Sequence, residues 1–302
     1  MAVRRTTDRF LFESNDPRIV PVLRIGFAFL MLVYVSIWLA DAGLWFSDQG
    51  VLTKGTAERI SQVTATRWSL LKLLPDTPTV VRSCLCVMLI HTALLLVGWW
   101  PRLQTLCLFV WLVSFQQRNP LLCDGEDTLF RALAFWMTFL PLGARWVWLR
   151  RNSRAHRPVT SADCWALRLI QLQMAVIYAS ATWNKLQGST WHDGTAMYYV
   201  FATVDHFGRM TFPSTWLDNI VLVKTITWTA LGIEAIVPVA VWFRWTRKPA
   251  LLAALALHLG IELTMHLFLF QWVMILGWLS FVNLDEWRWH TKRESVDGAK
   301  SD

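Results

Sequence analysis

Lys185 is the residue whose type and position first suggest chemistry. It closes an apolar run from Trp165 to Trp183, which is about long enough to cross a bilayer. An ammonium group is expensive in that environment unless it has a partner or a reaction to serve. A desolvated lysine gives up its proton more readily, so its amine can act as a base near neutral pH. The alternative is a lysine that snorkels to the membrane surface, as lysines at helix ends commonly do.

A few other ionisable residues also lie inside apolar runs, and each needs a partner there. Glu234 lies within the run 219–243, where desolvation favours either pairing with a cation or uptake of a proton. The two interpretations are a structural pair with Arg24 or Arg131, and a catalytic acid or base. The remaining buried candidates are His91, Arg168, His258, Glu262 and His266.

His258, Glu262 and His266 are spaced by four residues, so they share one face of a helix. Such a ladder can bind metal. However, the closer His/Glu spacings of zinc motifs are missing, and so are the repeated histidine boxes of membrane di-iron enzymes. We therefore expect no metal, and we interpret the ladder as a hydrogen-bonded stripe between helices.

The elements that must position these residues are membrane helices. Apolar residues make up 55% of the 302 residues, charged residues only 17%, and tryptophan occurs 20 times, which is unlike a soluble domain. The predicted fold is an all-α polytopic bundle with about eight transmembrane helices. The apolar runs fall at 19–40, 79–100, 103–117, 128–143, 165–184, 219–243, 249–267 and 268–284. The runs 103–117 and 128–143 are short, and a re-entrant pair there would reduce the count to six.

The net charge of +8 is distributed as a topology signal. Basic residues cluster before the first run and in every second loop after it, which places both termini in the cytoplasm by the positive-inside rule. Nucleic acid is therefore not an expected partner. The basic residues are Arg4, Arg5, Arg9, Arg18, Arg145, Arg150, Arg151, Arg154, Arg157, Arg244, Arg247, Lys248, Arg288, Lys292, Arg293 and Lys300.

Segments 42–78, 116–127 and 185–218 are then expected to face outward. The first has a glycine-centred turn at Asp48–Gly50 and the apolar spacing of an interfacial helix. The third is rich in aromatic residues, as in an interfacial belt or in a lid over an outward pocket. No cleavable signal peptide and no disulfide framework are expected, because the N-terminal 18 residues are polar and only Cys123 faces outward.

Four stretches resemble one family across nearly the whole chain. They are FSDQGVLT (46–53), SFQQRNPLLCDGEDTLFRALAFWMTFLPLG (114–143), YASATWNKLQGSTWHDGTAMYY (178–199) and HLGIELTMHLFLFQWVMILGWLSF (258–281). Together they resemble the horizontally transferred transmembrane (HTTM) domain, whose members include the vitamin K-dependent gamma-carboxylase and shorter bacterial proteins. The most specific piece is Lys185-Leu186 followed by Trp191 and Gly194, and the second is the spacing from His258 through Phe270 to Met274.

The resemblance implies a reaction and a set of site residues. In the carboxylase the lysine that matches Lys185 deprotonates reduced vitamin K, so the implied cofactor is a vitamin K-like hydroquinone. We predict a catalytic set consisting of Lys185, Glu126, Asp127, His258 and Glu234. The predicted cofactor contacts are Trp191, Tyr178, Phe270, Trp272 and Met274. We expect the partners of Lys185 to come from segment 123–127 and from the run that carries His258.

The sequence also departs from the carboxylase. Asp124-Gly125-Glu126-Asp127 stands where the carboxylase has Asn-Asn-His-Ser, so Glu126 replaces a supporting histidine, and Ile261 replaces an asparagine. The domains expected are a cytoplasmic segment 1–17, the HTTM-like transmembrane domain 18–287 and a cytoplasmic polar tail 288–302. No soluble substrate-recognition domain follows, so a protein substrate recognised in that way is not expected.

Two classes of function remain open. The first is a membrane enzyme of the carboxylase or epoxidase kind, a lyase or oxidoreductase that acts on a quinol-like lipophilic acid. The second is a non-catalytic membrane protein, either a transporter or an assembly partner for a secreted peptide, in which the same charges form a buried polar core. A transporter would show inverted repeats with broken helices in corresponding halves, and the sequence shows neither clearly.

Overall fold

The computed structural model describes residues 10–12, 16–64, 68–144, 146–147, 159–202, 208–210 and 212–287. Several predictions fall outside these residues. They concern the domain ends 1–9 and 288–302, the aromatic and polar residues at 203–207, and the basic residues Arg4, Arg5, Arg9, Arg145, Arg150, Arg151, Arg154, Arg157, Arg288, Lys292, Arg293 and Lys300.

Every regular element of the described chain is a helix, and the described residues contain no paired strand beyond an isolated bridge between Gly208 and Met265. Each of the eight predicted apolar runs contains a helix. These helices are α2 (Val20–Ala40), α5 (Pro78–Val97), α6 (Pro101–Arg118), α7 (Gly125–Met137), α8 (Trp165–Lys185), α13 (Ile220–Ala240), α14 (Arg244–Thr264) and α15 (Phe270–Trp278). The all-α prediction is confirmed.

Four helical segments among the described residues are long and apolar enough to cross a membrane: Pro17–Ala40, Pro78–Val97, Ala162–Lys185 and Ile220–Ala240. The other four helices are shorter or more polar, so the count of eight crossings stays a prediction. The apolar run 268–284 corresponds to α15 and the 3-10 turn η6 (Leu279–Phe281) that follows it, so its predicted ends agree with the structure to within a few residues.

One prediction about the basic clusters is wrong. Arg244, Arg247 and Lys248 were expected in a loop, but they form the first turns of α14. The helix begins this early because the Arg247 side chain is held from two sides. Its Nε donates to the Val241 carbonyl at 3.1 Å, and one terminal nitrogen donates to Glu286 at 2.8 Å.

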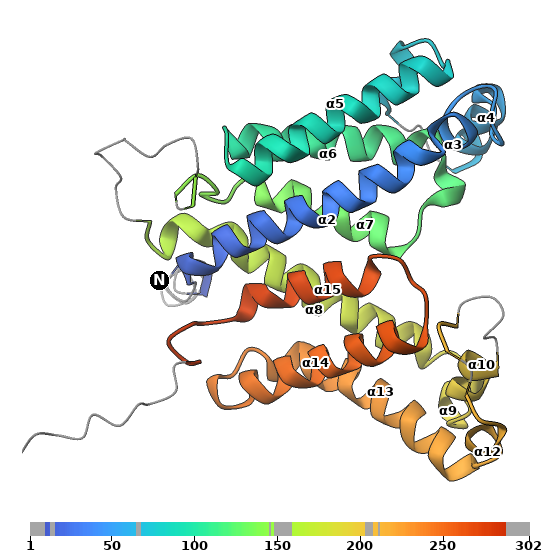
Figure 1. The fold of residues 1–302 in the computed structure, drawn as a ribbon. Helices are drawn as coiled ribbons and strands as arrows, with labels where there is room; N and C mark the ends of the chain where they lie inside the picture. Colours follow the sequence, from blue (N-terminus) through green and yellow to red (C-terminus); the bar gives the residue numbers. More distant parts are fainter. Residues whose placement is uncertain are drawn as a thin grey trace, which may run out of the picture.

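The eight helices of the apolar runs alternate in direction, so their connections gather at two ends of the bundle (Figure 1). One end holds the start of α2, the α13–α14 connection and the end of the described chain. The other end carries the short helices of the predicted outward segments: α3 (Ala42–Phe46), α4 (Lys54–Thr64), α9 (Ser189–His192), α10 (Ala196–Ala202) and α12 (Ser214–Leu217). We call this second end the loop-rich end.

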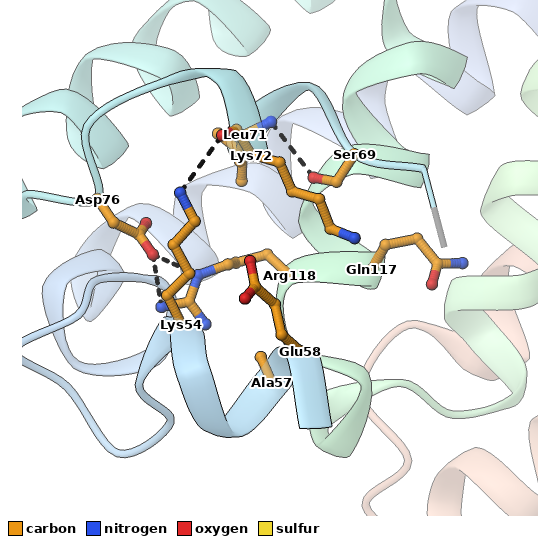
Figure 2. A pocket seen from close by; sticks show the side chains of 9 residues that line it. All are labelled: Lys54, Ala57, Glu58, Ser69, Leu71, Lys72, Asp76, Gln117 and Arg118. Atoms are coloured by element: carbon orange, nitrogen blue, oxygen red, sulfur yellow. Dashed lines mark hydrogen bonds and ion pairs between the residues drawn. The ribbon is translucent and has the colours of Figure 1, made fainter. Parts of the chain in front are cut away.

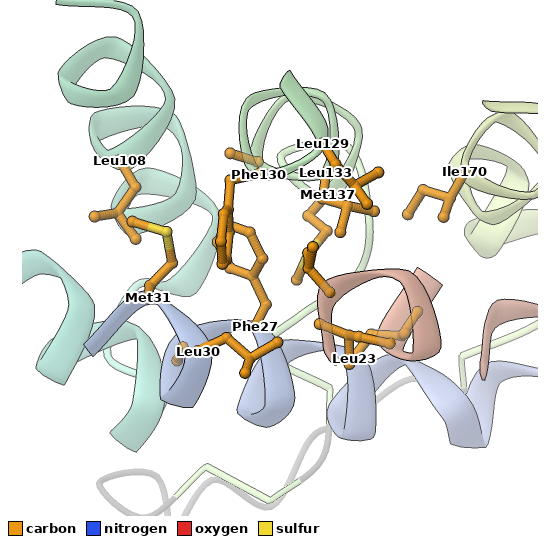
Figure 3. Packing of buried hydrophobic residues seen from close by; sticks show 14 of the residues in the cluster. Leu23, Phe27, Leu30, Met31, Leu108, Leu129, Phe130, Leu133, Met137 and Ile170 are labelled. Atoms are coloured by element: carbon orange, nitrogen blue, oxygen red, sulfur yellow. The ribbon is translucent and has the colours of Figure 1, made fainter. Parts of the chain in front are cut away.

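The core lies where α2, which packs against α5 and α15, meets buried side chains of α6, α7 and α8. Phe27 and Met31 of α2 are fully buried, and Phe27 packs against Phe130 of α7 with ring centroids 6.0 Å apart (Figure 3). Leu108 of α6 and Ile170 of α8 complete this layer. Burial of such side chains stabilises the bundle by about 1.5–3 kcal/mol each relative to water, and it holds α8, which carries Lys185, in place.

Local capping fixes the ends of the helices that carry candidate residues. Asp124 and Asp127 form a reciprocal capping box at the start of α7, which places Glu126 in the first turn. Thr77 caps α5, Asn219 caps α13, and Gly98 ends α5 in the left-handed conformation at φ 81°.

Candidate functional site

Lys185 and Glu234 form an ion pair between α8 and α13. The Lys185 ammonium nitrogen contacts both carboxylate oxygens of Glu234. The lysine side chain is 27% exposed and the glutamate side chain 11%. The predicted pairing of Glu234 with Arg24 or Arg131 is wrong. Arg24 donates instead to the carbonyls of Leu142 and Trp146, and Arg131 donates to Gln116, because neither arginine faces α13.

The ion pair lies below the surface of the loop-rich end. Glu234 lies 14 residues after Ile220, the first residue of α13. At 1.5 Å per residue, the part of α13 from Ile220 to Glu234 is roughly 20 Å long. The outer part of α13 packs against α9 and α10 (Figure 1). The chain after Lys185 therefore folds back over the end of α8, and the lysine is not a freely snorkelling side chain.

Trp191 places an aromatic face against the lysine. The Lys185 Nζ lies 5.1 Å from the Trp191 ring centroid, within range of a cation–π interaction. The Trp191 carbonyl accepts a hydrogen bond from Trp228 Nε1 at 3.2 Å, which ties α9 to α13. Gly194 has φ 75°, and a Cβ there would lie 2.9 Å from side-chain atoms of Lys224 and Trp228. A glycine is needed at this position for the turn to approach α13.

A buried polar chain lies on the same side of α8. Tyr178 precedes Lys185 by seven residues, or two helical turns, so both side chains occupy one face of α8. The Tyr178 hydroxyl lies 2.6 Å from His258 Nε2, and His258 Nδ1 hydrogen-bonds Gln271 Oε1. Since an amide oxygen can only accept, Nδ1 carries the proton and Tyr178 donates to Nε2. This chain links α8, α14 and α15.

The polar chain and the ion pair are close enough to interact electrostatically. His258 is within range of the Lys185 charge, and Tyr178 is within range of Glu234. The two groups therefore form one polar region in an otherwise apolar part of the bundle. Of the predicted catalytic set, the structure brings together Lys185, Glu234 and His258.

Glu126 and Asp127 form a separate group at the start of α7. Glu126 accepts a hydrogen bond from the backbone N–H of Leu269 at 2.9 Å, whereas Asp127 accepts one from the Tyr34 hydroxyl. Burial raises the pKa of Glu126 to about 7, and the neighbouring Asp124 charge adds to this effect. The expectation that segment 123–127 supplies the direct partner of Lys185 is wrong, because the ion-pair partner comes from α13.

The segment between α14 and α15 connects the two groups. The backbone N–H of Leu269 donates a hydrogen bond to the Glu126 carboxylate. Two residues later, the Gln271 side-chain oxygen accepts a hydrogen bond from His258. Phe270 lies between them and faces the backbone of Gly125, where an added Cβ would come within 3.0 Å of its ring. Phe270 therefore packs against the start of α7.

The remaining predicted cofactor contacts are Met274, Tyr178 and Trp272. Met274 and Tyr178 are buried in the core, and Trp272 donates from Nε1 to Glu262 at 3.3 Å. Glu262 also pairs with Arg209 at 2.7 Å.

The predicted single-face ladder of histidine and glutamate does not form, because α14 ends at Thr264, before His266. Within the described residues no three His, Cys, Asp or Glu side chains gather as a metal site.

Sequence reasoning missed Gln271 and Tyr34. Each is a polar side chain with apolar neighbours inside an apolar run, and this was a usable signal, because a hydrogen-bonding group in a membrane helix needs a partner.

Residues 12–287 match the HTTM domain. Two curated proteins of Bacillus subtilis (strain 168) are also similar to parts of the chain. Sporulation-delaying protein SdpB is 27% identical over 120 residues, and the uncharacterized protein YitO is 28% identical over 151 residues. These matches cover 38% and 48% of this chain, and they span only 36% and 48% of the two relatives. No solved structure matches the chain.

Proposed function

The chain belongs to the HTTM domain family of membrane proteins, and we propose that it is an integral membrane enzyme in which Lys185 and Glu234 together remove a proton from a lipophilic acid. The observation that carries this proposal is the ion pair beneath the loop-rich end, with the Trp191 ring beside the ammonium group. The resemblance of this segment to the gamma-carboxylase, in which the matching lysine is a base, supports the same assignment.

The pair can act as one acid–base unit. For the Lys185 amine to accept a substrate proton, the proton shared within the pair must first reside on Glu234. The substrate proton then moves to Nζ, and the face of Trp191 stabilises the ammonium that forms. Glu234 releases its proton to solvent, which reaches the partly exposed pair, and its carboxylate restores the ion pair. Both partners are therefore needed for turnover.

The substrate class that we propose is a reduced quinone or a related acidic ring compound. A quinol would supply an acidic hydroxyl and two reducing electrons. In this proposal the Lys185 amine accepts the proton of the quinol hydroxyl, and the Trp191 ring stacks on the quinol ring. Tyr178 and Met274 are buried and Trp272 is bonded to Glu262, so we assign the ring contact to Trp191 and leave the other predicted contacts as predictions.

We assign His258 a positioning role. Its hydrogen bonds to Tyr178 and Gln271 hold α8 against α14 and α15, and thereby set the direction of the face that carries Lys185. Glu126 and Asp127 hold the start of α7 against α15 and α2. These three residues touch neither Lys185 nor Glu234 through a hydrogen bond that the structure describes.

The test compares Lys185→Arg, Lys185→Ala and Glu234→Gln in purified protein supplied with chemically reduced menaquinone and with dioxygen as the electron acceptor, since consumption of a quinol is a two-electron oxidation. Arginine keeps the positive charge but does not lose its proton in proteins. We expect both Lys185 variants and Glu234→Gln to lower quinol consumption by roughly 10²–10⁴-fold, the usual contribution of a general base. Lys224→Arg is the matched control, because Lys224 also faces a tryptophan, with its Nζ 5.8 Å from the Trp228 ring.

Melting temperature separates chemistry from packing in the same samples. Lys185→Arg keeps an ion pair and is expected to melt like the wild type. Breaking a fully buried ion pair lowers the free energy of unfolding by about 3–5 kcal/mol. Glu234→Gln is expected to lower it by less, because Lys185 is 27% exposed and can reach water. Full activity of Lys185→Arg would refute a base at this position. A wild type that consumes no quinol would refute the substrate class.

The non-catalytic alternative rests on the same contact. If the pair only fastens α8 to α13, function in cells must follow melting temperature across the variants, and Lys185→Arg must be tolerated. The name of SdpB, a sporulation-delaying protein, describes that relative and does not decide between the two classes for this chain.

A further inference from the structure

An apolar groove lies between α14 and α15, toward the end of the bundle opposite the loop-rich end. Its volume is about 90 Å³, several times the roughly 10–15 Å³ that a single water molecule needs. Every residue that lines it is leucine, isoleucine, valine or tryptophan, so water inside it would find almost no hydrogen-bond partners. The lining includes Leu251, Leu252, Leu255, Ile275, Trp278 and Trp287.

The groove continues into an exposed apolar stripe on α14. Leu252 and Leu255 are 52% and 38% exposed, and Leu259 and Leu263 follow at 37% and 68%. Successive members lie three or four residues apart, so they share one side of the helix. From Leu252 to Leu263 the stripe is roughly 16 Å long at 1.5 Å per residue. A hydrocarbon chain that enters the groove can therefore extend along α14.

A lysine stands at one end of the groove. Lys248 precedes Leu251 and Leu252 by three and four residues, which places it on the same side of α14, one turn from the groove. The Lys248 Nζ lies 5.8 Å from the ring of Trp287, which itself lines the groove. The apolar surface therefore ends at a cation, on the side where α14 begins.

The positive charge at this end is not neutralised within the described part of the chain. Arg247 pairs with Glu286 at 2.8 Å. Arg244 and Lys248 are exposed and lie one helical turn apart, and neither forms an ion pair with a described residue. Two basic side chains beside an apolar surface favour an anionic headgroup whose hydrocarbon chain covers that surface.

The charged pocket at the loop-rich end differs from the groove. It lies between the start of α4, the 3-10 turn η2 (Leu70–Leu73) and the end of α6 (Figure 2). Its volume is about 20 Å³, room for roughly one water molecule. Arg118 pairs with Asp76 at 2.9 Å, and the Lys54 ammonium donates to the Lys72 carbonyl at 3.3 Å. These contacts anchor the loops to α6, so the groove is the better candidate for a ligand.

We propose that the groove binds one hydrocarbon chain of a phospholipid with a net negative charge, such as phosphatidylglycerol. The chain lies along Leu251, Leu252 and Leu255, and the phosphate lies against Lys248. A zwitterionic phospholipid brings the same chains and the same phosphate, but its ammonium group would meet two cations of the protein. The lipid binds independently of the reaction proposed at Lys185.

The test is native mass spectrometry of the delipidated full-length protein, titrated with phosphatidylglycerol and phosphatidylcholine of identical acyl chains. We expect phosphatidylglycerol to bind roughly tenfold more tightly, the size of effect that one or two basic residues have on an anionic lipid. Lys248→Gln is expected to bring the two affinities within about threefold of each other, because it removes the cation nearest the groove. Lys224→Gln is the matched control, because Lys224 also lies 5.8 Å from a tryptophan ring, that of Trp228, but belongs to α13.

A second pair of variants tests the groove itself. Leu255→Trp fills the groove and is expected to weaken both lipids about tenfold, because the chain loses buried apolar contact. Leu259→Trp is the matched control. Leu259 lies one turn further along α14 with the same exposure, but it does not line the groove, so its affinities are expected to equal those of the wild type within about twofold. Melting temperatures verify that each variant is folded.

Three results would overturn the proposal. Equal affinity of the wild type for the two lipids would refute the anionic headgroup, and unchanged binding by Leu255→Trp would refute the groove as the place of the chain. The third is displacement of phosphatidylglycerol by menaquinone from the wild type, combined with weaker menaquinone binding by Leu255→Trp, which would assign the groove to the tail of a quinone. We expect menaquinone to leave the lipid in place. None of the substituted residues contacts Lys185, so failure here leaves the quinol test unaffected.

Discussion

Two neighbouring carboxylates at the start of α7 have different surroundings. Asp127 accepts hydrogen bonds from the Tyr34 hydroxyl and from the backbone of Asp124. Glu126 is similarly buried, but its described hydrogen bonds are to the backbone of the α14–α15 segment, and among the described residues its carboxylate forms no ion pair. Burial therefore favours the protonated form of Glu126, and the charge of this carboxyl changes near neutral pH.

The stability of the protein is predicted to fall as pH rises through neutrality. The pKa of Glu126 is raised from 4.5 to about 7 by folding. The stabilisation from the protonated carboxyl is therefore complete below about pH 4.5 and is lost as pH rises through 7, by about 3 kcal/mol at most. Melting temperatures measured from pH 5 to 8 should decline more for the wild type than for Glu126→Gln. Asp218→Asn, at an exposed carboxylate, is the control, and parallel curves for the wild type and Glu126→Gln would contradict the prediction.

Individual site residues could be predicted from the sequence, but their pairings could not. Lys185 and Glu234 each stand out as an ionisable group in an apolar run. Their contact joins residues 49 positions apart, and it depends on α8 packing against α13, which no spacing within either run encodes. The same holds for His258, whose partner Gln271 lies on another helix.

At the scale of elements, the turn between α3 and α4 sets the shape of the loop-rich end. The sequence predicted a glycine-centred turn over Asp48–Gly50, and the structure confirms a turn there. The backbone N–H of Val51 donates a hydrogen bond to the Leu44 carbonyl at 2.9 Å. The Asp48 carboxylate accepts a hydrogen bond from the backbone N–H of Lys54 at 2.7 Å. This turn brings the start of α4 to the pocket that contains Arg118.

Substitution of Gly50 is predicted to destabilise this turn. A Cβ at Gly50 would lie 2.0 Å from the Leu44 carbonyl oxygen, which is backbone and cannot rotate away. We expect Gly50→Ala to cost about 1–3 kcal/mol in unfolding free energy. Gly55→Ala in α4 is the matched control, because a Cβ there meets nothing within 4 Å, and alanine favours the helix by up to about 1 kcal/mol. Equal melting temperatures for the two variants in detergent would show that the turn is not tightly packed.

Helices could be predicted from the apolar runs, whereas their boundaries could not. Apolar composition places a helix in each run, but the ends depend on capping groups and tertiary bonds. The apolar run begins at 128, yet α7 begins at Gly125 because Asp124 and Asp127 cap it. Similarly, α14 begins within a basic cluster because Glu286, from the far end of the chain, holds Arg247.

At the scale of the whole molecule, two independent features divide the bundle into the same two ends. Because the eight helices alternate in direction, the amphipathic and aromatic segments lie at the loop-rich end (Figure 1). The described residues next to the basic clusters lie at the opposite end. Charge asymmetry across a membrane is an orientation signal. We therefore propose that the end opposite the loop-rich end is cytoplasmic, which places the Lys185–Glu234 pair and the charged pocket toward the outer face.

This orientation is tested by cysteine accessibility in intact cells, on a background in which all five native cysteines are replaced. Positions 152, 205 and 296 follow from the charge pattern but lie outside the described residues, so we choose two exposed described positions. Thr215 in α12 lies at the loop-rich end, and Arg244 lies at the α13–α14 connection. A membrane-impermeant maleimide is expected to label Thr215→Cys in intact cells and Arg244→Cys only after permeabilisation, because α13 separates the two positions. Labelling of Arg244→Cys in intact cells would show that the protein has the opposite orientation in the membrane. An outward-facing base at Lys185 would then be untenable.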